Sequence, residues 1–395
     1  MRELSIQVHR TLSPSHLTFT PRTELCPPRT SPLPRAPNSV PRTPHLPNSV
    51  PFASTPLPDA DLNIDRKPDI INAAITTLTL TMNTFQIALT NVLVTIACIV
   101  PGFVLCKCRR AVADHIPTIS AILIYIGTPF LELTSFASLR YEPGHLAQMG
   151  LFFVISLAAQ LAFCLGFYLI AGKKRTLQPT RVVNVAAVLG NVGYFGLPLI
   201  RAILPGNALA LCCATMFIVS MNIVTFTVGV YLLTGDRLHI SVRSALINPA
   251  TIGLMISVPF YFFGWGNYLP TAVTSMASNI AGMTAPLCMF VVGIRLAGTD
   301  FKALFVRGNA YLAALLKLIA FPLFCWLLTW PISRFLPLQP ELRLTLVVLA
   351  ATPCASHTLN FSELYGVNPD LAANCILIST ILCFATLPAF TLLPM

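Results

Sequence analysis

The segment LGNVGYFGLPLI, residues 189–200, decides how the rest of this sequence is interpreted. It lies inside an apolar run long enough to cross a lipid bilayer, yet it contains three glycines, an asparagine and a proline. Glycine and proline weaken a helix interior, and a backbone N–H or C=O freed by a break finds no water in hydrocarbon. Such a break survives only where protein or an aqueous cavity surrounds it. The segment therefore predicts a buried feature with a function.

The composition identifies the class of protein. Hydrophobic residues make up 55% and charged residues 10% of the 395 residues, and the mean hydropathy is +0.74. Soluble domains contain about a quarter charged residues, so the chain is predicted to be an all-α polytopic membrane protein. The net charge is +11, but the basic residues lie in short clusters between apolar runs, which argues against nucleic-acid binding. The cysteines form no CxxC pair, and we expect neither a disulfide framework nor a metal site.

The first 81 residues differ from the rest. They hold 14 of the 33 prolines, and PNSVP occurs twice, at 37–41 and 47–51. Such a composition predicts a disordered segment, 1–81. Because the apolar pattern begins directly after Met82, we hypothesise that Met82 is the natural start; a genuine tail that binds a proline-recognising partner is the alternative. The predicted membrane domain is residues 82–395.

Ten apolar runs of about 20 residues, the length of one membrane crossing, follow Met82. They lie near 84–105, 116–138, 146–170, 181–203, 208–233, 244–264, 272–297, 308–332, 342–364 and 370–392. The loops after odd-numbered runs carry twelve lysines and arginines, and those after even-numbered runs carry four. The positive-inside rule then places the odd-numbered loops in the cytoplasm and both termini outside it. The expected location is the cell (inner) membrane.

Prolines at matching positions indicate an internal repeat with halves of about 82–235 and 241–395. The matching pairs are Pro101 and Pro259, Pro129 and Pro286, and Pro198 and Pro353, at offsets of 158, 157 and 155 residues. Because each half contains an odd number of spans, the halves would be inverted relative to each other, as in many secondary carriers.

The two breaks of this repeat predict the site. Span four breaks at GNVGYFGLP, 190–198, and span nine at ATPCASHTLN, 351–360. In an inverted repeat they meet at mid-membrane, where the N-termini of half-helices attract an anion such as a carboxylate. The predicted substrate-binding residues all lie at the breaks: Asn191, Gly193, Gly196, Pro198, Thr352, Pro353, Ser356, His357 and Asn360. For the polar side chains, an interhelical hydrogen bond is the alternative role.

Two ionisable residues lie inside the expected spans, where charge is costly and usually functional. Glu132, three residues after Pro129, is a candidate to carry a coupling proton or cation, although it could instead lie near the outer boundary of the membrane. Lys317 could neutralise an anion or pair with a carboxylate; the alternative is a side chain that extends to the cytoplasmic interface. Asn91, Asn222, Asn248 and Asn279 are better explained as interhelical hydrogen-bonding residues.

Four segments together resemble the auxin efflux carrier family, whose bacterial members include proposed malonate and other organic-acid transporters. These are LGNVGYFGLPLI, GTPFLEL (127–133), APLCMFVVGIRLAG (285–298) and TPCASHTLNFSELYGVNPDLAANCILISTILCFATLPAF (352–390). The resemblance covers about residues 82–393. It implies ten spans in two inverted five-helix repeats, broken helices four and nine that cross at Pro198 and Pro353, an organic-anion site beside them, and an elevator-like movement. The short loop between spans five and six is similar to the bacterial type.

The expected function is a secondary carrier that moves a small organic anion, such as malonate or another carboxylate, by alternating access. No cofactor is expected, and coupling to H⁺ or Na⁺ is open. The closest alternative is a sodium-coupled symporter of bile-acid-type architecture, ahead of a channel or a membrane sensor. No HExxH or GxSxG motif supports an enzyme. The expected partners are the anion and the lipid bilayer, without nucleic acid, and the sequence is compatible with a homodimer.

Overall fold

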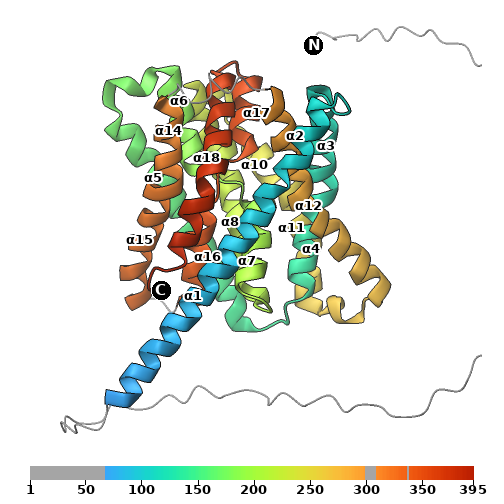
Figure 1. Cartoon of the computed structure of the whole chain (residues 1–395), viewed down its shortest axis with the longest axis vertical. Helices are drawn as coiled ribbons and strands as arrows, with labels where there is room; N and C mark the ends of the chain where they lie inside the picture. Colours follow the sequence, from blue (N-terminus) through green and yellow to red (C-terminus); the bar gives the residue numbers. More distant parts are fainter. Residues whose placement is uncertain (1–66, 299–307, 336–337) are drawn as a thin grey trace, which may run out of the picture. The chain divides into compact units, whose positions relative to one another are not determined.

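The computed structural model describes residues 67–298, 308–335 and 338–395, and within these ranges every regular element is a helix (Figure 1). The helices before residue 240 are α1 (Lys67–Ala97), α2 (Ile99–Lys107), α3 (Ile116–Ile122), α4 (Thr128–Ala137), α5 (Pro143–Ile170), α6 (Gln178–Val188), α7 (Leu197–Ile203), α8 (Ala208–Val224) and α9 (Val230–Thr234). Those after it are α10 (Val242–Leu246), α11 (Pro249–Phe263), α12 (Thr271–Gly298), α14 (Gly308–Leu315), α15 (Phe321–Phe335), α16 (Pro340–Ala350), α17 (Ser356–Leu364) and α18 (Pro369–Phe390).

Short helical turns join several of these helices into longer rods. The π-helical turns are η3 (Leu123–Gly127), η5 (Val192–Gly196), η6 (Thr225–Gly229) and η9 (Leu316–Ala320). The 3₁₀ turns are η2 (Ala113–His115), η4 (Gly172–Thr176), η7 (Arg237–His239) and η8 (Trp265–Tyr268). Single π-helical turns inside α-helices are frequent at functional sites, and three of these four, η3, η5 and η6, line the cavity described below.

Eight helical segments of the described chain are long and apolar enough to cross a membrane. They are Thr81–Lys107, Ala113–Ala137, Pro143–Ile170, Ala208–Thr234, Arg237–Phe263, Thr271–Gly298, Gly308–Ile332 and Pro369–Phe390. Each overlaps one of the ten expected spans. The other two expected spans, 181–203 and 342–364, are both divided into two short helices, α6 and α7 in one and α16 and α17 in the other.

The amino-terminal boundary differs from the sequence prediction. Helix α1 begins at Lys67, so residues 67–81 are helical although they belong to the segment expected to be disordered. This stretch, KPDIINAAITTLTLT, contains no proline after Pro68 and carries many apolar residues, so it can extend the first span by several turns. The rest of the predicted disordered segment, 1–66, lies outside the described residues.

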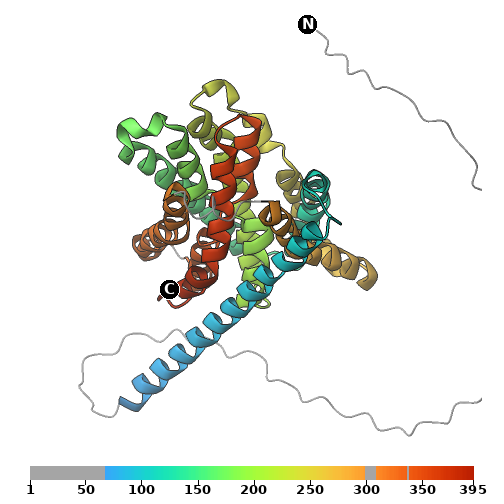
Figure 2. The same ribbon diagram turned by 45° about the horizontal axis from the view of Figure 1, so that its top comes forward.

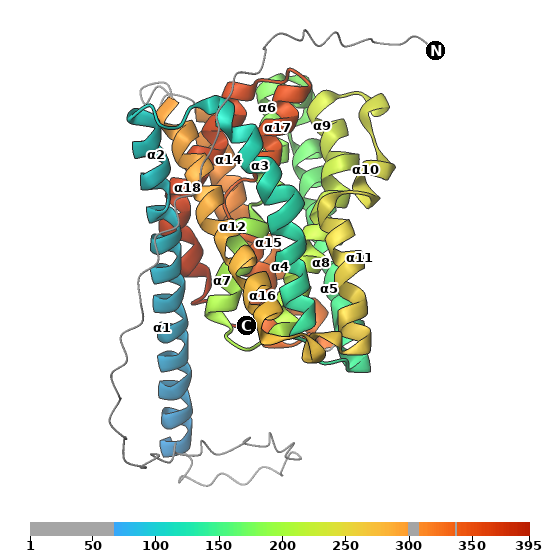
Figure 3. The same cartoon turned by 90° about the vertical axis from the view of Figure 1, so that its right-hand side faces the viewer.

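The two broken segments run in opposite directions. Figures 1 and 3 place α6 and α17 at one end of the helix bundle and α7 and α16 nearer the other. The chain therefore passes the middle of the bundle from α6 to α7 and returns in the reverse sense from α16 to α17. All residues from 182 to 188 in α6 are buried, as expected for a helix covered by protein on every side.

Most of the extensive helix packing falls into two groups, which α1 joins because it packs along α18. In the first, α2 packs along α12 and α4 along α11; in the second, α5 packs along α8 and α14 along α18. The broken segments belong to the second group, because α6 contacts α14 and α18, and α16 contacts α8 and α15. Figure 2 shows gold α12 beside teal α3 and α4, and red α18 beside orange α14. Glycine permits the closest approach, since a Cβ on Gly293 would lie 2.7 Å from the backbone nitrogen of Phe103.

Candidate functional site

The two breaks satisfy each other's backbone. The Asn191 N–H donates to the Pro353 carbonyl oxygen at 2.8 Å, and the Ala355 N–H donates to the Leu189 carbonyl oxygen at 2.9 Å. These bonds form an antiparallel β-bridge between Gly190 and Cys354. We call this contact between residues 189–191 and 353–355 the crossing. The polar groups freed by the breaks are therefore paired with each other rather than left in hydrocarbon.

Glycine is required where the two segments touch. A Cβ on Gly190 would overlap the Thr352 hydroxyl, and a Cβ on Gly196 would lie 2.9 Å from the Leu349 Cδ2 atom. The crossing is further tied to α18, because the Cys354 N–H donates to the Ser379 hydroxyl at 2.9 Å. The break in residues 189–200 thus builds a close, hydrogen-bonded contact with its counterpart in residues 351–360.

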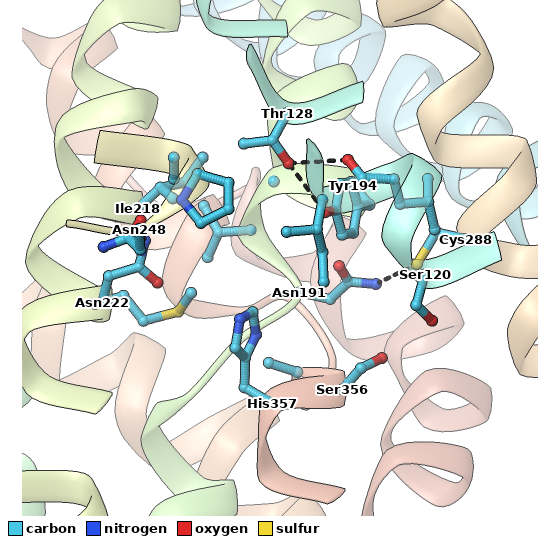
Figure 4. Close-up of a pocket in the computed structure, with 18 of the residues that line it drawn as sticks. Ser120, Thr128, Asn191, Tyr194, Ile218, Asn222, Asn248, Cys288, Ser356 and His357 are labelled. Carbon is cyan, nitrogen blue, oxygen red and sulfur yellow. Dashed lines mark hydrogen bonds between the residues drawn. The ribbon is translucent and has the colours of Figure 1, made fainter. Parts of the chain in front are cut away.

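A cavity of about 270 Å³ lies beside the crossing (Figure 4). Its wall includes residues of α3, η3, α4, the N-terminus of α11 and the middle of α12 from the first helix group, and residues of the crossing, η5, α8, η6 and α17 from the second. The cavity therefore lies between the two groups. Apolar side chains cover most of the wall, and a small number of polar groups project into it, which is the usual character of a small-molecule site.

Two half-helices begin at this cavity. The continuous helix formed by η5 and α7 starts at Val192, and α17 starts at Ser356. Among the described contacts, the first-turn N–H groups of Gly193 and Tyr194, and of Ser356 and His357, have no hydrogen-bond acceptor. Helix N-termini carry partial positive charge and free donors, and both favour a bound anion.

Neutral polar side chains complete the cavity wall. Tyr194 and Thr128 share a hydrogen bond between their hydroxyl groups at 3.0 Å, and the Asn191 Nδ2 donates to the Cys288 Sγ at 3.6 Å. In Figure 4 the side chains of Ser356 and His357 extend from α17 toward the same space. These groups can donate to a carboxylate without bringing a negative charge of their own.

Glu132 brings the cavity's carboxyl group. Its side chain lines the cavity from α4, it is 1% exposed, and neither of its carboxyl oxygens has a hydrogen-bond partner. Gly253 of α11 approaches it closely, since a Cβ there would lie 2.9 Å from the Pro129 Cα and would overlap the Glu132 carboxylate. Glu132 therefore lies in the protein interior beside the candidate anion site.

Comparison with known proteins gives this geometry its context. The sequence profile of the family described as "Membrane transport protein" matches residues 87–391, which is most of the chain. The chain belongs to the membrane transport protein family. The match agrees with the resemblance to auxin efflux carriers that the broken segments carry. Membership in this family, together with the eight apolar helices, makes the chain a multi-pass membrane transporter.

One curated relative is similar over a large part of both chains. The protein named "Putative malonate transporter" from Rhizobium meliloti (strain 1021) is 25% identical over 235 residues, which cover 57% of this chain and 70% of the relative. The identity is low, so the relative's substrate does not transfer with the family assignment.

Within this transporter, the sequence-predicted site residues fall into two sets. Asn191, Gly193, Ser356, His357, Asn360 and Glu132 line the cavity. Gly196, Pro198, Thr352 and Pro353 are not part of its wall. The second set shapes the crossing instead: the Thr352 hydroxyl donates to the Leu349 carbonyl oxygen at 2.7 Å, and the Pro353 carbonyl accepts from Asn191.

For Lys317, the alternative in which its side chain extends to the cytoplasmic interface does not match the structure. It is fully buried, and its Nζ donates to the Ala350 carbonyl oxygen at 2.7 Å. Its Nζ would lie 2.8 Å from a Cβ on Gly190, so the ammonium group lies directly beside the crossing.

Several cavity residues escaped the sequence prediction. Thr128, Tyr194 and Cys288 lie within the quoted transporter segments, but nothing in their spacing indicated which way they face. Asn222 and Asn248 were expected to hydrogen-bond between helices, and the Asn222 Nδ2 does donate to the Asn248 Oδ1 at 3.3 Å. Both also line the cavity, so the interhelical pair contributes polar surface to the transporter's site.

Proposed function

We propose that this transporter is a secondary carrier that moves a small organic anion across the cell membrane by alternating access. The observation that carries the proposal is the meeting of two helix N-termini, with unpartnered N–H groups, at one cavity beside the crossing. The part of the cavity wall that the structure describes contains no lysine or arginine. The partial positive charges of the two helix N-termini would therefore attract a carboxylate without the full charge of an ammonium or guanidinium group, and so would still allow its release.

A dicarboxylate of malonate size is the substrate class that we favour. A cavity of about 270 Å³ is at the small end of ligand sites, which are typically about 300–1,000 Å³. The two half-helix N-termini offer one set of donors for each carboxylate group. The name of the relative from Rhizobium meliloti (strain 1021) supports the same class.

We further propose ten spans in two inverted repeats, with broken spans four and nine crossing. Two observations support this arrangement. The broken segments run in opposite directions. The helix pairing also has the symmetry of the repeat, in which span one corresponds to span six and span two to span seven. Helix α2 of span one packs along α12 of span seven, and α11 of span six packs along α4 of span two. In the same way, α5 with α8 corresponds to α14 with α18.

Alternating access would follow from movement between the two helix groups. The cavity wall is drawn from both groups, so a displacement of the group that contains the crossing would carry the bound anion relative to α4, α11 and α12. Rigid-body movement of one bundle against another is a common route of alternating access.

Coupling to protons is the energy source that the cavity favours. A carboxylate at Glu132 and a bound organic anion would repel each other in one poorly solvated cavity. We therefore propose that Glu132 carries a proton while the anion is bound, which makes the carrier an anion–proton symporter. The sodium-coupled symporter is the rival, and the two differ in which cation gradient drives uptake.

The experiment that tests the proposal is counterflow in liposomes. The purified full chain is reconstituted with unlabelled malonate inside, and entry of labelled malonate is followed, with other mono- and dicarboxylates as competitors. We expect the Asn191→Ala, Asn360→Ala double variant to lower counterflow at least about tenfold, because each hydrogen bond to a charged group contributes roughly 1.5–3 kcal/mol.

The matched control is Asn91→Ala. Asn91 lies in α1, outside the cavity, and its Nδ2 donates to the Ile87 carbonyl oxygen of its own helix. This variant should keep wild-type counterflow. Folded protein that moves none of the carboxylates would refute the organic-anion assignment.

A further inference from the structure

Lys317 is a buried lysine. Its ammonium group contacts a backbone carbonyl beside the crossing and an aromatic ring one turn further along its own helix. The residue lies in η9, is 0% exposed, and donates from Nζ to the Ala350 carbonyl oxygen at 2.7 Å. The ring of Phe321, four residues later, has its centroid 4.9 Å from Nζ. Within the described part of the chain, no ion pair includes Lys317.

The ammonium group lies at the negative ends of two half-helices. Ala350 is the last residue of α16, so its carbonyl belongs to the C-terminal turn of that helix. Gly190 follows two residues after the end of α6, and a Cβ there would lie 2.8 Å from Nζ. Helix C-termini carry partial negative charge, and a nearby cation stabilises them.

A crossing of broken helices therefore produces two sites of opposite sign. The N-termini of η5 and α17 face the cavity, while the C-termini of α6 and α16 face Lys317. The Ala350 carbonyl oxygen accepts from Nζ, and the Thr352 hydroxyl and Nζ both border the space that a Cβ on Gly190 would occupy. Oxygens of these types are the ligands that hard metal cations prefer.

We propose that Lys317 is the built-in cation of the crossing: its ammonium occupies the place between the C-termini of α6 and α16 where a bound metal cation would otherwise be needed. The inference rests on the proposed anion carrier and adds to it a structural reason why sodium is not required. Because the cation is covalently part of the protein, it is neither bound nor released in the transport cycle, and anion transport needs no sodium.

The test compares two substitutions with a matched lysine. Lys317→Ala removes the charge and leaves space, whereas Lys317→Met removes the charge but keeps most of the side-chain volume. Lys173→Met is the control, because Lys173 is exposed in η4. The full chain carrying each substitution is measured for thermal unfolding and for malonate counterflow in chloride salts of sodium, N-methyl-D-glucamine and methylammonium.

The wild-type protein and Lys173→Met should give equal unfolding temperatures and equal counterflow in all three salts. Lys317→Ala should lose counterflow at least about tenfold in N-methyl-D-glucamine, since a buried helix end loses its charged hydrogen-bond partner. Methylammonium or sodium, which fit the vacated space, should restore both its unfolding temperature and its counterflow. Lys317→Met should lose counterflow without recovery in any salt.

Three results would overturn the proposal: sodium-dependent counterflow of the wild type, a wild-type unfolding temperature that rises specifically with sodium, or Lys317→Met with wild-type counterflow and stability. The unfolding measurements need no substrate. If the wild type moves no carboxylate, the anion-carrier proposal fails, while cation-specific recovery of the Lys317→Ala unfolding temperature still decides the role of Lys317. If neither variant can be purified folded, the sodium response of the wild-type unfolding temperature decides it.

Discussion

At the scale of single residues, the crossing depends on the absence of a side chain at Gly190. The Thr352 hydroxyl and the Lys317 ammonium occupy the space that a Cβ would need. Asn191, the next residue, uses its N–H for the Pro353 carbonyl and its side chain for the cavity. One short stretch of backbone thus holds the structure together on one side and contributes to the site on the other.

The Gly190→Ala substitution should therefore damage the crossing. Overpacking a filled interior costs about 1–3 kcal/mol, and here one of the displaced groups is the end of a fully buried lysine. We expect a lower unfolding temperature and loss of counterflow. Gly166→Ala in α5 is the control, because nothing lies within 4 Å of a Cβ there. A Gly190→Ala variant that unfolds at the wild-type temperature would contradict the steric argument.

Glu132 is the residue whose substitution tests proton coupling. Glu132→Gln keeps the shape of the side chain but cannot exchange a proton. We expect uptake driven by an inward proton gradient to fall at least about tenfold, as for loss of a general acid or base, while counterflow, which needs no net proton movement, is retained. The measurement is labelled malonate entry into proteoliposomes with and without the pH gradient. Gradient-driven uptake that survives in Glu132→Gln would exclude this carboxyl as the proton carrier.

At the scale of helices, the main feature is that some apolar segments remain continuous through a π-helical turn, whereas two others break into separate helices. The π-helical turns η3 and η9 leave their rods unbroken, whereas the three residues between α6 and η5 and the five between α16 and α17 leave the helix entirely. The difference is the partner: residues 189–191 and 353–355 pair with each other, so each break is stable only in the presence of the other.

Close packing within the first helix group gives a prediction at this scale. In Gly293→Ala, the new methyl group would meet the backbone of α2 at Ile99 and Phe103. We expect a lower unfolding temperature, because main-chain atoms of a packed helix cannot move aside as a flexible side chain can. Gly282→Ala lies in the same helix with nothing within 4 Å. It should be neutral or slightly stabilising, and equal effects of the two substitutions would contradict the packing.

At the scale of the whole molecule, the basic loops predict the orientation in the membrane. Figure 3 shows α2, α6, α9 and α17 reaching the same end of the helix bundle. The loops at these helix ends include Lys107, Arg109 and the Lys173–Arg175 cluster of η4. We therefore propose that this end faces the cytoplasm, as the positive-inside rule predicts.

Thiol labelling checks this orientation. Cys108 is exposed in the loop after α2, and Tyr268, which is 83% exposed, lies between α11 and α12. A membrane-impermeant maleimide added to intact cells should label the Tyr268→Cys variant at position 268, and should label Cys108 only after permeabilisation. Mass spectrometry assigns each label, with Cys108→Ser as the control. The reverse pattern would invert the proposed topology.

The class of protein, its family and the positions of its helices follow from the sequence by itself, because they depend on local properties. Eight of the apolar runs match the eight helical segments of the described chain that are long and apolar enough to cross a membrane, and glycine and proline located the breaks in the other two. Only the start of α1 at Lys67 departed clearly, since a proline-rich composition upstream masked a helix-forming stretch. Asn191, Ser356, His357 and Asn360 were found as cavity residues because they adjoin the breaks.

The tertiary structure decided what the side chains do. That Gly190 pairs with Cys354, that Lys317 turns inward to the end of α16, and that Glu132 and Tyr194 share one cavity depend on helix rotation and on neighbours far apart in the chain. The helical period determines which residues lie on the same face of a helix. In an apolar helix that is buried on several sides, however, no polar face indicates how the helix is rotated about its axis. The roles of these residues follow from packing, which only the assembled helices determine.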